Sequence, residues 1–305
     1  MIMKKENVTL EIDTVHFPKV LLLGNGLLKL GGEGMSWEQL LQKIRTRDVG
    51  VQTKEVPYAM QPEVVCGVDV QDIQKRVADT IKTAGNPHPL LETLLKFPFD
   101  AVLTTNYTYE AEQILSGGRW SESARNKAFS ALDGNAKVGH NSFICNAVKT
   151  PEGKTVPVFH IHGEAARKRS MTLSYYSYAN ALARMVSYNK KLANSLQELQ
   201  EEQKKRICGS WLDYFLMGDV WSVGFGLDVS EFDIWWAIER KAREKARHGK
   251  LHAFFAGEPD TQSPQSLLLE AMEAVATYVP VKDGNYEEHY ETIIARIQDE
   301  FMKRE

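Results

Sequence analysis

The sequence predicts an α/β fold, a doubly wound, mostly parallel Rossmann-like sheet with helical inserts, formed by a single domain over residues 1–305. Short apolar runs of strand length recur along the chain and alternate with helix-like patterns. Several of these runs end in glycine or polar turns, as expected of strands that are buried on both faces of a parallel sheet. With 305 residues, of which 43% are hydrophobic and 25% charged, the chain can bury a substantial core.

The predicted strands are the short apolar runs. The first is Val20 to Leu23, and it ends in the turn Gly24-Asn25-Gly26. The other predicted strands cover 101–105, 156–159, 220–223, 251–255 and 275–279. Because helical patterns separate most of these runs, we expect parallel pairing through crossover connections.

The predicted helices have apolar residues at helical spacing. Ser36 and Gln39 form a capping-box pattern at the start of one helix, whose apolar face includes Leu40 and Ile44. Further helices are predicted at 70–84, 89–97, 107–115, 231–247 and 286–302. We expect helical inserts at about 47–97 and 179–206, the second of them amphipathic.

Charge and cysteine content narrow the functional classes. The chain has 37 Lys and Arg against 40 Asp and Glu, for a net charge of −3, and no basic cluster that would predict direct nucleic-acid binding. Cys66, Cys145 and Cys208 are too far apart for a C-x-x-C zinc pair, and their odd number gives no disulfide framework. We find no signal peptide and no apolar stretch of membrane-spanning length, so we expect a cytoplasmic protein without membrane contact.

Four predicted strands end in turns that could form a site. These turns are Gly24-Asn25-Gly26, Thr104-Thr105-Asn106, His162-Gly163 and Gly224-Phe225-Gly226. In an open parallel sheet, ligands bind beyond the carboxyl ends of the strands, at the point where the strand order reverses. We therefore expect the four turns to share one pocket.

The glycine turns and Asn106 suit a nucleotide. Glycines at 24 and 26 would allow backbone amides to approach a pyrophosphate, although glycines that only turn the chain are the alternative. Asn106 could hold a ribose hydroxyl or a water molecule through its amide, or it could cap the helix that follows.

His162 suits proton transfer. Its ordinary pKa lies near neutrality, so it could act as a general base, while the alternative is a histidine buried in the core. His160 and His162 are two residues apart and could ligate a metal from one side of a strand. No nearby cysteine or acidic pair completes a familiar zinc spacing, so we expect no metal.

The four strand ends, in this order, resemble the sirtuin-like NAD-binding family, and specifically its bacterial branch of NAD-consuming antiviral effectors. The resemblance covers about residues 17–280. It is carried by Gly24-Asn25-Gly26, Thr104-Thr105-Asn106-Tyr107, His162-Gly163 and the segment from Gly224 to Asp233.

The resemblance implies an NAD glycohydrolase that releases nicotinamide and ADP-ribose, serving as an antiphage defence effector that depletes NAD when triggered. It implies Asn106 and His162 as catalytic residues and NAD as the substrate. The residues implied to bind NAD are Gly24, Asn25 and Gly26 at the phosphates, Gly224 and Asp233 near the adenosine end, and Thr105 and Gly226. The chain lacks the paired C-x-x-C zinc module of deacylating sirtuins, which argues against an acyl-lysine substrate.

A second hypothesis is a non-catalytic scaffold that senses NAD or another nucleotide within a defence complex. It is motivated by Thr108 and Gly226, which stand where the family often has an aspartate and a serine. No sensor or translocase domain is evident in a chain of this length. We therefore expect a homo-oligomer, or a separately encoded sensor or ATPase protein, to control the site.

Overall fold

The fold is that of a computed structural model of the chain. The structure describes residues 11–13, 16–32, 34–48, 50, 53–81, 87–121, 127–129, 141, 144–202, 205–207, 210–244, 248–259 and 261–302. None of the helices in these ranges combines the length and the apolar character that a membrane span requires.

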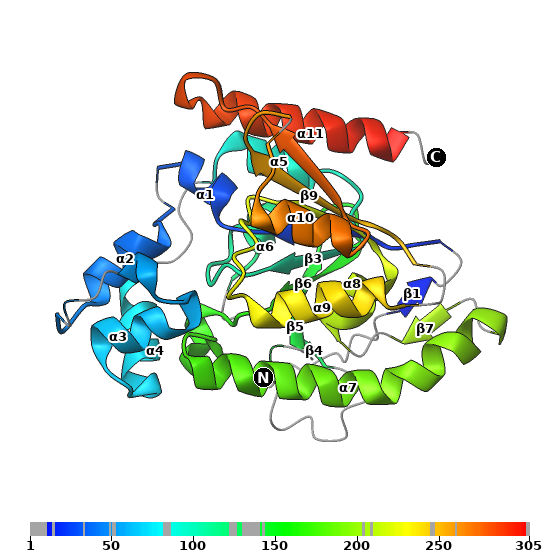
Figure 1. The fold of residues 1–305 in the computed structure, drawn as a ribbon. Helices are drawn as coiled ribbons and strands as arrows, with labels where there is room; N and C mark the ends of the chain where they lie inside the picture. Colours follow the sequence, from blue (N-terminus) through cyan, green and yellow to red (C-terminus); the bar gives the residue numbers. More distant parts are fainter. Residues whose placement is uncertain are drawn as a thin grey trace.

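The main sheet has six parallel strands and two antiparallel edge strands (Figure 1). The parallel strands are β2 (Lys19–Leu23), β3 (Ala101–Thr104), β6 (Thr155–His160), β8 (Asp219–Val223), β9 (Leu251–Ala256) and β10 (Val275–Val279). The antiparallel strands are β5 (Ile144–Lys149) and β4 (Lys127–Phe129). The strand order is β10-β9-β8-β2-β3-β6-β5-β4. The predicted α/β class with a mostly parallel sheet is confirmed.

The order of the strands reverses at β2. From β2 the chain builds β3 and β6 on one side, then returns to place β8, β9 and β10 on the other. Consequently β2 pairs in parallel with both β3 and β8, and Leu23 lies level with Thr104 and Val223 at the three strand ends. This is the arrangement that leaves a crevice at the carboxyl ends of the central strands.

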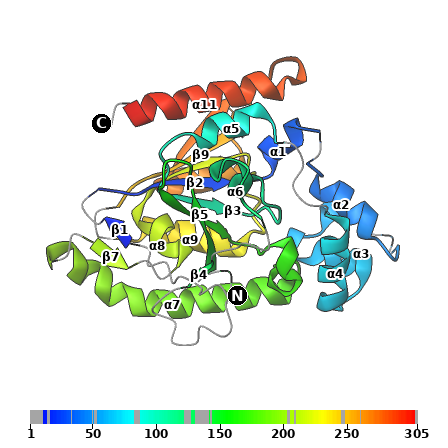
Figure 2. The same ribbon diagram turned by 180° about the vertical axis from the view of Figure 1, so that it is seen from behind.

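Helices cover both faces of the sheet. One face carries α1 (Gly26–Leu30), α5 (Pro89–Leu95), α6 (Glu110–Leu115) and α11 (Tyr286–Met302). The other carries α7 (Tyr175–Glu202), α8 (Trp211–Met217), α9 (Phe232–Ala242) and α10 (Pro264–Ala271). Figure 2 shows α5 and α11 above the sheet and α7 below it.

Strand alternation explains why both faces are apolar. Leu21 and Leu23 of β2 pack against the α11 layer, whereas Val20 and Leu22 pack against the α8 and α9 layer. All four side chains are fully or almost fully buried. A strand that is buried on both faces must be apolar at every position, and this is the pattern that made β2 recognisable in the sequence.

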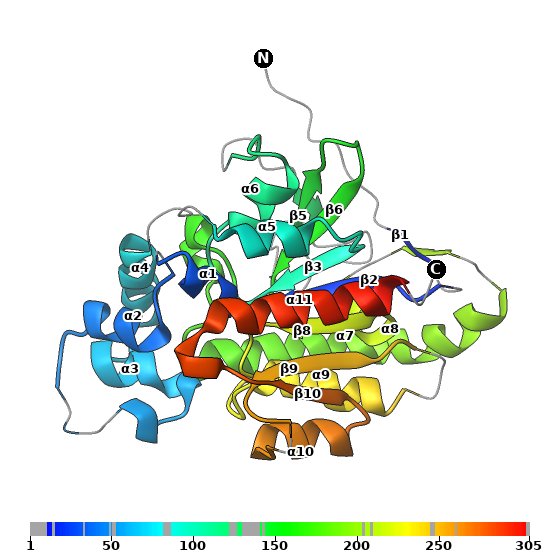
Figure 3. The ribbon, with the colours of Figure 1, turned by 90° about the horizontal axis from the view of Figure 1, so that it is seen from above.

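A helical insert forms a separate small core beside the sheet. It consists of α2 (Trp37–Ile44), α3 (Gln61–Cys66) and α4 (Val70–Thr80), and it packs on Met171 and Leu173. Figure 3 shows it beside α1, at the end of the sheet where β2 leads into α1. The predicted insert covered about 47–97. In the structure α2, which precedes this range, packs with α3 and α4, whereas α5, which lies inside it, packs on the sheet. The predicted capping box of Ser36 and Gln39 is confirmed.

Several elements differ from their predicted bounds. Helix α7 begins at Tyr175, and its predicted last residues are replaced by β7 (Lys205–Ile207), which pairs with β1 (Glu11–Asp13). Helix α9 ends at Ala242 instead of 247, and residues 245–247 lie outside the described ranges. The sequence did not indicate α8, because all seven of its residues are buried and no amphipathic stripe exists to be recognised.

Candidate functional site

Asn106 is held by three hydrogen bonds directly after β3. Its backbone N–H donates to Thr104 Oγ1 at 3.1 Å, and its side-chain Nδ2 donates to the Gly24 carbonyl at 3.2 Å. Its own carbonyl accepts a hydrogen bond from His160 Nδ1 at 2.7 Å. The side-chain Oδ1 accepts no hydrogen bond from any residue that the structure describes. The amide is therefore oriented through its nitrogen, and its oxygen remains available to a ligand.

Asn106 does not cap the helix that follows. The N-cap position of α6 is occupied by Tyr109, whose side chain makes no capping hydrogen bond. The helix-cap alternative for Asn106 is therefore wrong, because the chain takes an extra turn before α6 begins.

His160 holds the backbone of Asn106 in place through a hydrogen bond to its carbonyl. The buried ring places Nδ1 on the Asn106 carbonyl and Nε2 on Glu112 Oε1 at 2.8 Å. An imidazolium ring can donate to both partners at once, because it carries a hydrogen on each nitrogen. Burial lowers the pKa of His160, but the Glu112 charge raises it further, and the net shift is upward. Asn146 Nδ2 also donates to Glu112, at 2.7 Å, which fixes the carboxylate.

His162 lies just past β6 and faces two carboxylates from the start of α9. Its Nε2 is 3.1 Å from Asp233 Oδ2 and 3.6 Å from Glu231 Oε2. All three side chains are buried. The Tyr178 hydroxyl of α7 donates to Glu231 Oε2 at 2.9 Å, and the Tyr178 ring packs edge-on against the His162 ring. His162 is thus contacted by Tyr178 of α7 and by the two carboxylates at the start of α9.

The carboxylates change the protonation of His162. Burial lowers its pKa, but the charges of Asp233 and Glu231 raise it further, to about 9. The pKa of Glu231 is itself raised, chiefly by burial and against the effect of the His162 charge. At neutral pH His162 therefore carries a proton in this arrangement, and it must leave the ion pair or lose that proton before it can act as a base.

The two glycine turns pack against each other. Gly24 N–H donates to the Val223 carbonyl at 2.9 Å, and Gly26 N–H donates to the Gly224 carbonyl at 2.8 Å. A Cβ on Gly24 would lie 2.3 Å from the Gly224 oxygen, so the close approach of β2 and β8 requires glycine there. A Cβ on Gly226 would meet no atom within 4 Å. Gly24 thus has a structural role in this turn, whereas Gly226 borders open space.

A substitution at Gly24 should therefore cost far more than one at Gly226. We expect Gly24→Ala to lower the free energy of unfolding by about 1–3 kcal/mol or more, because the new methyl group overlaps backbone atoms that cannot move freely. Gly226→Ala is the matched control and should change it by less than about 0.5 kcal/mol. Urea denaturation of both variants measures the difference, and equal stabilities would show that the two turns do not pack as described.

The other predicted residues occupy the same region with different contacts. Asn25 donates from Nδ2 to the Met35 carbonyl at 2.8 Å, and Thr105 is half-buried between β3 and Asn106. The resemblance placed Asp233 with Gly224 at the adenosine end, but in the structure its carboxylate contacts the His162 ring. His160 and His162 do not share a ligand site, because His160 faces Glu112 and His162 faces α9.

Three residues of the site, Glu231, Tyr178 and Glu112, have no local signal in the sequence. Glu231 lies two positions before Asp233 in the sequence, and this spacing alone does not predict a site. Tyr178 and Glu112 lie in helices, and their local sequence does not distinguish them from other helical residues. Each gains its role from a partner that is distant along the chain.

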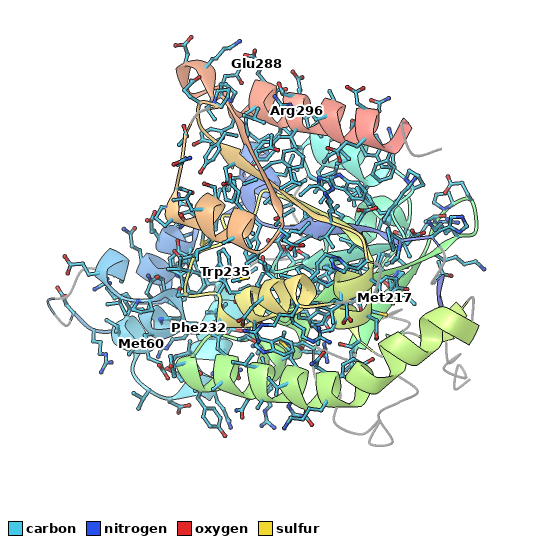
Figure 4. The ribbon with its side chains drawn as sticks, turned by 45° about the vertical axis from the view of Figure 1, so that its right-hand side comes forward. Met60, Met217, Phe232, Trp235, Glu288 and Arg296 are labelled. Carbon is cyan, nitrogen blue, oxygen red and sulfur yellow. The ribbon has the colours of Figure 1, made fainter. Side chains whose placement is uncertain are left out.

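The insert and α7 contact the start of α9 beside Glu231 and Asp233. The Tyr58 N–H of the insert donates to Ser230 Oγ at 3.1 Å, and the Tyr175 ring of α7 packs edge-on against Phe232. Figure 4 shows Phe232 at the start of α9, on the side where Met60 of the insert lies. These two contacts join the insert and α7 to residues that flank Glu231, the N-cap residue of α9.

Comparison with known proteins leaves the family open. No family model matches the chain, and no curated protein matches it. The functional assignment below therefore depends on the site itself and on the resemblance of its motifs.

Proposed function

We propose that this protein hydrolyses the bond between nicotinamide and ribose in NAD, releasing nicotinamide and ADP-ribose. The observation that carries the proposal is the state of Asn106, whose amide nitrogen is fixed on Gly24 while its Oδ1 faces no described protein donor. This oxygen lies at the carboxyl end of β3, next to the crevice between β2 and β8, where doubly wound sheets bind nucleotides.

The reaction needs a group that stabilises positive charge. As nicotinamide leaves, the ribose C1′ becomes cationic, and water attacks it from the opposite face. The partially negative Asn106 Oδ1 can orient that water by accepting a hydrogen bond from it. The atoms balance as NAD plus water giving ADP-ribose, nicotinamide and one proton.

His162 is proposed as the group that accepts a proton from a ribose hydroxyl or from the attacking water. In the ligand-free protein its Nε2 is held by Asp233 Oδ2 at 3.1 Å. Because the ligand-free pair is buried and protonated, we propose that NAD binding or a partner separates His162 from the carboxylates. The open space at Gly226, together with Asn25, Thr105 and Gly224, is proposed to receive the phosphates and the second ribose.

The motif resemblance supports a cellular role in antiphage defence. We propose that the protein acts in the cytoplasm as a homo-oligomer or with a separately encoded sensor or ATPase protein. In this role the buried ion pair of His162 would keep NAD hydrolysis low until the trigger arrives.

The proposal is tested by nicotinamide release from NAD, followed by chromatography. His162→Ala is compared with His248→Ala, a histidine that precedes β9 at the amino end of the sheet and contacts the Gly249 carbonyl. We expect background release from His162→Ala and release at the unchanged rate from His248→Ala. Equal rates in both variants would refute the assignment of His162.

A second candidate is a scaffold that binds NAD without cleaving it. It is favoured by the protonated, carboxylate-bound state of His162, which is not the state of a ready base. Calorimetry that detects NAD binding, with no nicotinamide after long incubation of the assembled protein, would support the scaffold over the hydrolase.

A further inference from the structure

His162, Glu231 and Asp233 form a buried cluster of possible metal ligands, and the proposed reaction gives Glu231 no role. His162, Glu231 and Asp233 each offer one ligand atom, and these atoms all lie within 4.8 Å of one another. All three side chains are buried. We propose that this cluster, defined as the His162 cluster, binds a divalent metal ion of the zinc class.

The spacing of the ligand atoms fits such an ion. Zinc binds histidine nitrogen and carboxylate oxygen at about 2.0–2.2 Å in tetrahedral geometry, which places two ligand atoms about 3.3–3.6 Å apart. The distances from His162 Nε2 are 3.1 Å to Asp233 Oδ2 and 3.6 Å to Glu231 Oε2. The two separations from His162 are therefore close to those around a tetrahedral ion, and the two carboxylate oxygens lie within 4.8 Å of each other. A tetrahedral ion on these three atoms would leave one position for water or another oxygen ligand.

The charge of the cluster also favours a divalent cation. Two buried carboxylates face one histidine, and among the described residues neither Glu231 nor Asp233 forms a salt bridge with Lys or Arg. Burying unpaired negative charge is costly. A divalent ion with two carboxylates and a neutral imidazole has no net charge, so the ion would remove this cost.

Hydrogen bonds around the cluster hold the carboxylates in place. The Ile234 N–H donates to Asp233 Oδ1 at 2.9 Å, which leaves Oδ2 turned to His162. The Tyr178 hydroxyl donates to Glu231 Oε2. Such outer contacts orient ligands and increase metal affinity. The imidazole ligand favours a zinc-class ion over magnesium, which prefers oxygen ligands and retains water.

The bound ion would regulate the site. A metal on Nε2 occupies the nitrogen through which His162 exchanges its proton with the carboxylates. If the proposed NAD hydrolysis is correct, on which this consequence alone rests, zinc would inhibit it by holding His162 in the cluster. Metal binding itself can be measured without NAD, so the two proposals can fail separately.

The experiment uses the full chain after treatment with a chelator and dialysis. Zinc is titrated by calorimetry, and cobalt is added to a second sample to record its visible absorption. We expect one zinc per chain and the cobalt bands of a four-coordinate nitrogen and oxygen site. Asp233→Asn and Glu231→Gln should each lower zinc affinity by more than about 100-fold, because direct ligands matter more than the outer contacts that contribute 10–100-fold.

Glu112→Gln is the matched control, since Glu112 is also a buried carboxylate on a buried histidine, His160, but among the described residues it belongs to no group of three ligand atoms of this kind. It should bind zinc like the unchanged protein. Thermal unfolding identifies a variant that fails to fold, in which case the other ligand variant decides. Absence of zinc binding, unchanged affinity in a folded ligand variant, or a cobalt–thiolate charge-transfer band would each overturn the proposal.

Discussion

Nicotinamide release by the Asn106→Ala variant is expected to be about 10²–10³-fold slower than release by the unchanged protein. The side-chain Oδ1, which faces no described donor, is the group placed to orient water at the cationic ribose carbon. Alanine removes this oxygen and leaves space in a site that has to exclude stray water. The backbone of residue 106 keeps its contacts with Thr104 and His160 in this variant. Only the Nδ2 contact with the Gly24 carbonyl is lost, so the turn should persist.

Asn189→Ala is the matched control for this prediction. Asn189 is an asparagine of α7 whose Oδ1 accepts a hydrogen bond from Arg240 at 2.9 Å, away from the strand ends. It should retain the catalytic rate. Initial rates and thermal unfolding are measured for both variants, because a loss of rate in Asn106→Ala that only followed unfolding would not support a catalytic role. Unchanged kcat in a folded Asn106→Ala protein would contradict it.

In metal-free protein kcat/KM for NAD hydrolysis is expected to rise with pH through about 9, the pKa of His162 in the ligand-free protein, because kcat/KM reports the ionisation of the free enzyme. The base form of His162 exists only above that pKa, because Asp233 and Glu231 stabilise the imidazolium more than burial disfavours it. Asp233→Asn removes the nearest negative charge and should move the midpoint at least about one pH unit lower. Asp100→Asn is the control, since Asp100 lies at the amino end of β3 and binds the Lys19 N–H.

The same ion pair makes stability depend on pH. The folded pKa of His162 lies above its unfolded value, so the contribution is fully present below about pH 6.5 and is lost as pH rises through about 9. A shift of this size corresponds to at most about 3 kcal/mol. Chemical denaturation at both ends of the window, with chelator present, should show this loss in the unchanged protein. A loss of the same size in Asp233→Asn would show that the pair is not its source.

Much of the fold could be predicted because its strands are apolar on both faces. β2, β3 and β8 appear in the sequence as continuous apolar runs, and each predicted strand is present within a few residues of its expected bounds. Two elements that were not predicted have weak local patterns. Helix α8 is buried on all sides, so it has no amphipathic stripe. Strand β5 is placed by its antiparallel pairing with β6. Their positions depend on tertiary packing, which cannot be predicted from a few neighbouring residues.

The candidate site, like the fold, was predicted only in part from the sequence. That Asn106 and His162 follow strands was visible locally, and the parallel sheet brings their turns to one edge. The direction of each side chain was not visible. His160 and His162, two residues apart, face different partners because β6 ends at His160 and the next residues leave the strand geometry.

By itself, then, the sequence determined an α/β fold with glycine, Asn106 and His162 turns at strand ends, because hydrophobic periodicity and turn residues act over a few positions. The contacts of Asp233 and Glu231 with His162, the rise of its pKa to about 9 and the packing of Gly24 on Gly224 follow from the three-dimensional fold. Those contacts join segments far apart in the chain, and charge and steric effects depend on distance in space. The acidic pair that the sequence lacked beside His162 is supplied by the start of α9.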